Sequence, residues 1–140
     1  MKKAALIAII LVLCSSNLSF AATFGFTYGD NTFNDPAPPR LRYPINETAV
    51  LATEAALEFS WWNDLLDTRG FILKVYKGYN MYGDNLILKE ELPQDVSRYS
   101  ADSGLFDDGQ VYTWSLLRVT GAGYKSERSF NSFKVVRKNG

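Results

Sequence analysis

The adjacent carboxylates Asp107 and Asp108, followed by Gly109, are the residues of this chain whose types and spacing could perform acid–base chemistry. Two carboxyl groups can cleave a glycosidic bond when they lie about 5 to 9.5 Å apart and one of them has a raised pKa. Adjacent residues on a hydrophilic turn satisfy neither condition well. We therefore expect a turn here, and a glycan-active enzyme using Asp107, Asp108 or Asp102 as acid and base remains the less favoured alternative.

The composition excludes catalysis by histidine or cysteine more firmly than catalysis by carboxylates. The chain has no histidine, and its one cysteine is Cys14. This composition provides no Ser-His-Asp or Cys-His nucleophile system and no ordinary zinc site. The sequence also lacks the motifs of phosphate-binding and calcium-binding loops. We therefore expect no catalytic residue, no metal and no cofactor.

The first 21 residues have the pattern of a bacterial signal peptide. Lys2 and Lys3 precede an apolar run that ends at Leu13, and a polar stretch then leads to Ala21. The apolar run is too short to span a bilayer, which needs roughly 20 residues, so we expect no membrane span. Cys14 follows a bulky leucine, which makes a lipid anchor the weaker alternative. We predict cleavage after Ala21 and export to the periplasm or the extracellular space.

The remaining residues, 22–140, suit one domain, with an N-terminal extension over 22–37 and the domain itself over 38–137. The whole chain balances 15 basic against 15 acidic residues, which argues against a nucleic-acid partner. The basic residues concentrate near the C-terminus, where they either protect an exposed edge strand or bind an anionic polysaccharide. They are Arg118, Lys125, Arg128, Lys134, Arg137 and Lys138.

Short runs with a period of two predict an all-β fold. Leu57, Phe59 and Trp61 alternate with polar residues, and the later runs repeat this pattern. Turn signals rich in Gly, Asn and Asp separate the runs. The segment 47–59 could form a helix, although a first strand and a turn fit it better. Six or seven such strands predict an antiparallel two-sheet sandwich. Strands are expected near 57–62, 71–77, 86–90, 98–101, 111–119 and 132–138.

The ordered motifs of the chain resemble those of a fibronectin type III domain of bacterial exported proteins, from Pro38 to Val136. The entry is "PAPPRLRYP", the second strand ends in Trp61, and the third begins at Phe71 as aromatic-x-Leu-x-Val. A later run then places Tyr112 and Trp114 two residues apart. Phe130 and Phe133 depart from the pattern because their odd spacing cannot turn both inward on one regular strand. We expect a bulge or a late strand start near residues 131–132.

The resemblance implies structural roles for four aromatic residues. Tyr112 would send its hydroxyl back to the backbone a few residues upstream, as a tyrosine does at the corner before the sixth strand of such sandwiches. Trp61, Phe71 and Trp114 would lie in the core.

Aromatic residues outside the core pattern are the candidates for ligand binding. Trp62, Tyr76, Tyr79 and Tyr82 fall out of phase or in the run "YKGYNMYGDN". Exposed flat rings can contact a sugar or a protein, although tyrosines also occupy ordinary strand surfaces.

The N-terminal extension carries an alternating aromatic face at Phe24, Phe26 and Tyr28. It could add a strand to its own sheet, remain a tether, or donate a strand to a neighbouring subunit. We therefore predict an exported, non-enzymatic binding or adhesion module for a protein or polysaccharide of the cell envelope. A structural subunit of a surface assembly is the alternative, and the oligomeric state is left open.

Overall fold

The computed structural model describes residues 35–46, 48–52 and 54–138. The predicted signal peptide and the alternating run Phe24–Tyr28 lie outside the described residues, so they remain predictions. Within the described ranges, no helix has the length and apolar character needed to cross a membrane.

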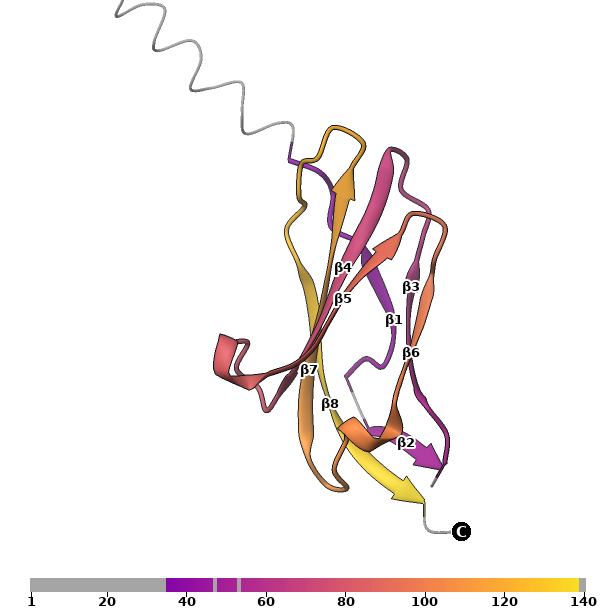
Figure 1. Ribbon diagram of the computed structural model, residues 1–140, viewed down its shortest axis with the longest axis vertical. Coiled ribbons are helices and arrows are strands. Elements are labelled where there is room, and N and C mark those ends of the chain that lie inside the picture. Colours follow the sequence, from indigo (N-terminus) through magenta and orange to yellow (C-terminus); the bar gives the residue numbers. More distant parts are fainter. Residues whose placement is uncertain (1–34, 47, 53, 139–140) are drawn as a thin grey trace, which may run out of the picture. The chain divides into compact units, whose positions relative to one another are not determined.

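The described residues form eight strands in two sheets, one more strand than the upper prediction (Figure 1). The three-stranded sheet has the order β1-β3-β6, with β1 at Arg40–Tyr43, β3 at Leu57–Trp62 and β6 at Arg98–Ala101. The five-stranded sheet has the order β2-β8-β7-β4-β5, with β2 at Thr48–Ala52, β8 at Ser129–Lys138, β7 at Val111–Thr120, β4 at Thr68–Lys77 and β5 at Leu86–Pro93. Two 3₁₀ turns, η1 at Gly83–Asn85 and η2 at Ser103–Leu105, complete the elements. The predicted all-β sandwich is confirmed.

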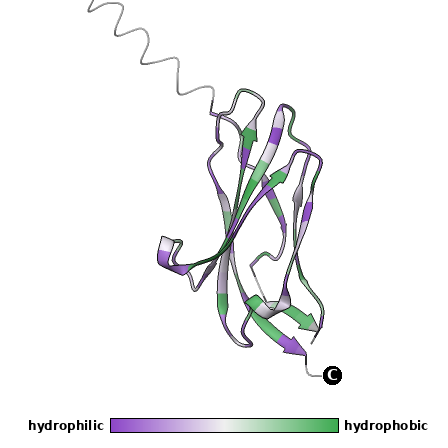
Figure 2. Cartoon of the chain, in the orientation of Figure 1, coloured by the Kyte–Doolittle hydropathy of each residue, from purple (hydrophilic) through white to green (hydrophobic). Residues whose placement is uncertain are grey.

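The segment around residue 50 forms strand β2 and not the alternative helix. β2 pairs with β8 in parallel register, with Val50 opposite Val136, whereas every other strand pair is antiparallel. Its alternate residues Ala49 and Leu51 are buried, so the period of two decides the structure over the helix propensity of this segment. Figure 2 shows this hydrophobic strand beside β8, whose last residues are hydrophilic.

Aromatic rings from both sheets fill the core. The ring of Phe59 on β3 lies 5.1 Å from that of Trp114 and 5.9 Å from that of Phe133, between centroids. The rings of Trp61 and Phe71 are 5.4 Å apart. These contacts join the three-stranded sheet to the five-stranded one, and such aromatic pairs contribute about 0.5–1.5 kcal/mol each beyond their buried area. The domain thus has a continuous apolar core.

A side-chain hydrogen bond also joins the sheets. The hydroxyl of Tyr99 on β6 donates to Glu90 Oε1 on β5 at 3.2 Å. Partial burial, with help from the Glu90 carboxylate, raises the pKa of Tyr99 above its usual 10.0. The hydroxyl therefore keeps its proton, and can donate it to Glu90, throughout the neutral pH range.

The start of β8 corrects the prediction for Phe130 and Phe133. The β7–β8 register runs without interruption from Val111 opposite Lys134 to Leu116 opposite Ser129, so no bulge is present there. Phe133 is buried at 2% exposure, whereas Phe130 is 58% exposed on the other face of the same regular strand. The odd spacing therefore marks an outward-facing aromatic residue and not a backbone irregularity.

Arg118 was expected in the basic surface cluster, and the structure shows that this expectation is wrong. Its position on β7 is two residues beyond the buried Leu116, so the side chain points inward and is 7% exposed. The guanidinium Nε donates to Ala37 O at 2.7 Å, and Nη1 donates to Leu66 O at 3.0 Å. Arg118 thus ties the segment before β1 and the β3–β4 loop to β7.

Candidate functional site

The three candidate acids of the sequence all make structural contacts. Asp107 Oδ2 accepts from Lys77 Nζ at 2.9 Å, and Asp108 Oδ1 accepts from the backbone N–H of Arg137 at 2.8 Å. Asp102 Oδ1 accepts from the backbone N–H of Gly104 at 2.9 Å. The hydrogen bond and the charge of Asp107 raise the pKa of Lys77 above its usual 10.5. Asp107 and Asp108 hold the turn that leads into β7, as the sequence predicted, whereas Asp102 caps the start of η2.

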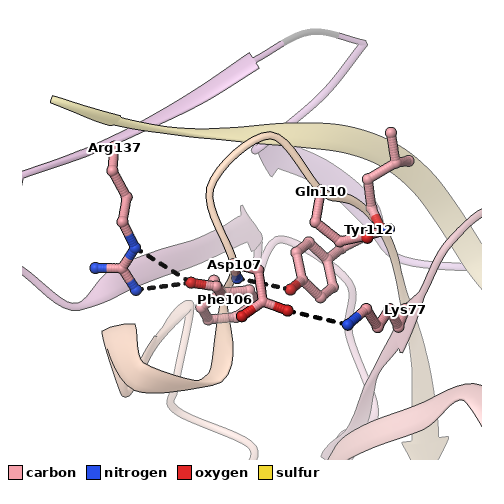
Figure 3. Close-up of polar contacts among 7 residues, drawn as sticks. Lys77, Phe106, Asp107, Gln110, Tyr112 and Arg137 are labelled. Carbon is pink, nitrogen blue, oxygen red and sulfur yellow. Dashed lines mark hydrogen bonds and ion pairs between the residues drawn. The ribbon is translucent and has the colours of Figure 1, made fainter.

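Tyr112 closes this corner (Figure 3). Its ring is 1% exposed, and its hydroxyl accepts from the backbone N–H of Asp107, five residues upstream, at 2.8 Å. Arg137 supports the same corner by donating through Nη2 to Phe106 O at 2.7 Å. The hydroxyl therefore lies where the resemblance to fibronectin type III domains places it.

The Tyr112→Phe substitution is expected to lower the free energy of unfolding by about 1 kcal/mol, because it removes this one hydrogen bond and leaves the Asp107 N–H without its acceptor. Urea unfolding followed by tryptophan fluorescence measures the difference. An unfolding curve that coincides with that of the wild type would contradict the role of the hydroxyl in the corner.

An aromatic groove lies where the β4–β5 loop meets the start of β8. Tyr79, Tyr82 and Phe130 are 73%, 71% and 58% exposed, respectively. They line one groove of about 540 Å³, although Phe130 is far from the tyrosines in sequence. The aromatic groove is formed by Tyr79, Asn80, Met81, Tyr82, Glu127, Arg128 and Phe130. Sequence reasoning identified the two tyrosines and missed Phe130, whose odd spacing from Phe133 was the available signal.

The β4–β5 loop is braced at both ends. Gly78 adopts a φ of 85° and donates its N–H to Val111 O at 2.8 Å, while its carbonyl accepts from Thr113 Oγ1 at 2.8 Å. At the other end, Asn85 Nδ2 donates to Asn80 O at 3.2 Å. Figure 1 shows η1 and this loop projecting from the side of the sandwich. The loop therefore presents its tyrosines on a hydrogen-bonded backbone.

Tyr76 does not belong to this surface, which corrects the sequence prediction. It is 4% exposed, and its strand neighbours are Leu86 on β5 and Thr113 on β7. The register of β4 against β5 shifts between Val75 and Tyr76. β4 keeps its regular register with β7 here, so Tyr76 lies on the face opposite the buried Val75. Its low exposure shows that neighbouring residues cover that face at this point, which the alternation rule alone does not predict.

Trp62 is exposed, but it lies apart from the aromatic groove. It is 48% exposed on β3, in the three-stranded sheet, whereas the groove is built on the five-stranded one. The guanidinium carbons of Arg40 and Arg42 lie 5.7 and 5.0 Å from its ring centroid. The four candidate residues therefore divide into one buried tyrosine, one separate tryptophan and the two tyrosines of the groove.

The residues expected to be structural are all buried. Trp61, Phe71, Tyr112 and Trp114 are each 3% exposed or less. Trp114 Nε1 also donates to Pro44 O at 2.7 Å, which fixes the chain between β1 and β2 against the core.

Comparison with known proteins gives structural matches alone, since no family model and no curated protein matches the chain. A computationally redesigned β-sandwich protein aligns with a TM-score of 0.54 and 11% identity, over 74% of this chain and 94% of that one. An Fn3-like protein from Clostridium thermocellum aligns with a TM-score of 0.49 and 16% identity, over 76% and 100% of the two chains. The fibronectin(III)-like modules of CbhA from the same organism align with a TM-score of 0.49 and 11% identity, over 72% of this chain and 99% of that one.

The two-sheet arrangement of the chain agrees with the redesigned β sandwich at the level of the overall fold. The solved structures that align with the chain include several fibronectin type III modules. The described part of the chain therefore has the fold of a two-sheet β sandwich.

Proposed function

We propose that the chain is an exported, non-enzymatic binding module whose protein partner docks on the aromatic groove. One observation carries the proposal: Tyr79, Tyr82 and Phe130 come from two separate segments, converge on one groove, and are each more than half exposed. Clustered exposed aromatic surface on a folded domain marks a site that another molecule covers.

The composition of the groove favours a protein over other partners. Tyrosine, phenylalanine, methionine and arginine are the residue types enriched at protein–protein interfaces, and this groove combines all four. Its charged residues, Glu127 and Arg128, balance each other, so the groove selects no strongly charged ligand. The partner is therefore expected to present an apolar surface with a polar rim.

The braced loop supports the same proposal. Tyrosine provides a large contact area with few rotatable bonds, and the Tyr, Gly and Asn content of residues 78–85 is also typical of antibody binding loops. Because hydrogen bonds at Gly78 and Asn85 already order the backbone, less conformational entropy is lost on binding. The signal peptide predicted at residues 1–21 adds that this partner is met outside the cytoplasm, as an envelope or extracellular protein.

The Tyr79→Ala/Tyr82→Ala double variant tests the groove. The protein from residue 22 is immobilised, partners from the envelope fraction are identified by mass spectrometry, and the affinity of each purified partner is then measured. Loss of two central aromatic anchors is expected to weaken binding by about 30-fold or more, since interface hot spots contribute about 2 kcal/mol or more.

Tyr124→Ala is the matched control, because Tyr124 is 70% exposed but is not among the residues that line the groove. Its affinity should equal that of the wild type. Equal affinity of the double variant would remove the groove from the interaction. Binding of an uncharged glycan that the double variant abolishes would replace the protein partner with a polysaccharide.

A further inference from the structure

A second cavity lies on the outer face of the three-stranded sheet, built by strands that take no part in the aromatic groove. It has a volume of about 310 Å³, near the lower limit of about 300–1,000 Å³ for small-molecule sites. We call it the arginine pocket. It is lined by Arg42 and Tyr43 of β1, Glu58, Ser60 and Trp61 of β3, Arg98 of β6 and Ser97 just before β6.

The guanidinium of Arg42 is positioned but has no anionic partner among the described residues. It lies over the ring of Trp62, 5.0 Å from the centroid, and this cation–π contact restricts its motion. Arg40 approaches the same ring, but it also forms an ion pair with Asp64. Arg42 therefore brings to the pocket a planar set of N–H donors that no described carboxylate neutralises.

The second arginine of the pocket is only weakly neutralised. Arg98 Nη1 lies 4.0 Å from Glu58 Oε2, and the two side chains are 73% and 50% exposed. An exposed ion pair at this separation has a weak interaction energy, so Glu58 neutralises little of the charge of Arg98. With Arg42, Arg98 and Glu58 together, the pocket has an excess of positive charge.

We infer that the arginine pocket binds an acidic sugar unit, that is, a sugar ring carrying one carboxylate. The fork of Arg42 matches a carboxylate in bidentate geometry. Tyr43 lines the pocket and is 40% exposed, so its aromatic ring is available to sugar C–H groups, while Ser60 and Ser97 can exchange hydrogen bonds with sugar hydroxyls. The small volume suits one ring with its carboxylate.

This inference does not depend on the protein partner proposed above, because the arginine pocket and the aromatic groove share no residue. The pocket can therefore be tested while the partner is unknown. The probe is trigalacturonate, and its trimethyl ester is the matched ligand, since esterification of all three carboxylates removes the charge and keeps the sugar rings. Calorimetric titration at low ionic strength measures both affinities, where screening of exposed charges is weakest.

The protein is expected to bind trigalacturonate and to bind its ester about tenfold more weakly or not at all, because the charge-assisted bond to arginine is lost. Arg42→Gln should weaken binding of the acid by about tenfold or more for the same reason. Glu58→Gln should tighten it about two- to fivefold, because it removes a repelling carboxylate and frees Arg98. Arg69→Gln, which changes an exposed arginine of β4, should leave the affinity unchanged.

Three outcomes would contradict the proposed site or its ligand. Equal binding of the acid and the ester, or unchanged binding by Arg42→Gln, would overturn the site. Competition by sodium sulfate at the same concentration as trigalacturonate would show a simple anion site and overturn the assignment to a sugar. Thermal melting of each variant controls for folding, and no shift is expected for side chains as exposed as these.

Discussion

The Trp114→Ala substitution is expected to lower the free energy of unfolding by about 3–5 kcal/mol, the range for deletion of a large buried aromatic side chain. Trp114 is 0% exposed, and its ring packs against Phe59 of the opposite sheet at 5.1 Å between centroids. The substitution therefore leaves a cavity between the sheets and removes the bond to Pro44 O. Urea unfolding monitored by circular dichroism measures the loss.

Phenylalanine substitutions at the two core tryptophans separate the packing from the hydrogen bond. Trp114 Nε1 donates to Pro44 O at 2.7 Å, whereas Trp61 Nε1 is buried with no partner among the described residues. Trp114→Phe should therefore destabilise the protein by about 1 kcal/mol more than Trp61→Phe. Equal losses at the two positions would contradict the structural role given to the Trp114 indole N–H.

The Arg118→Met substitution is expected to have the second largest effect, about 2–3 kcal/mol, because the variant loses charge-assisted bonds and leaves carbonyl groups without donors. The Ala37 and Leu66 carbonyls both accept hydrogen bonds from this guanidinium. The loss should appear in urea unfolding. It should also appear as faster amide hydrogen exchange in the β3–β4 loop, which Arg118 holds.

Arg118→Lys is the control that keeps the charge. A lysine ammonium is a single point donor and cannot reproduce the planar fork that reaches Ala37 and Leu66 together. Its stability should fall between those of the wild type and Arg118→Met. If the urea midpoint of Arg118→Met equalled that of the wild type, the buried guanidinium would not stabilise the fold.

The sequence was sufficient to predict most of the strands and most of the core, although it did not predict β1 at Arg40–Tyr43. Alternation marked Leu57, Phe59 and Trp61 as one buried face, and the structure buries all three. The predicted strand 98–101 agrees with β6 at Arg98–Ala101. These features follow from local periodicity, which a single chain displays directly. The position of Tyr112 after the Asp107–Gly109 turn was equally local, and its hydroxyl bonds within that turn.

Features that depend on strand pairing could not be predicted in this way. Phe130 joins Tyr79 and Tyr82 because β8 and the β4–β5 loop meet in space, and no spacing in the sequence encodes that meeting. Tyr76 lies on the face opposite Val75, yet neighbouring residues of the folded sheet bury it. Arg118 lies two residues after the buried Leu116 on β7, so its side chain points inward, although its charge had suggested a surface position.

The arginine pocket shows the same limit. Arg42, Ser60 and Arg98 are far apart along the chain, and three neighbouring strands bring them together. None of these residue types would signal a site at such distances in the sequence. Their value as a site comes from the register of β1, β3 and β6, which only the folded sheet provides.

The most direct test of the proposed binding surface is photo-crosslinking from position 130. Phe130 is replaced by p-benzoylphenylalanine, a second sample carries the same group at Tyr124, and both are irradiated with the envelope fraction. We predict one crosslinked partner from position 130. Excess unlabelled wild-type protein should abolish this crosslink, whereas unlabelled Tyr79→Ala/Tyr82→Ala protein should not. Position 124 should give no crosslink to that partner. Equal crosslinking from the two positions, or equal competition by the double variant, would contradict the assignment of the aromatic groove as the binding site.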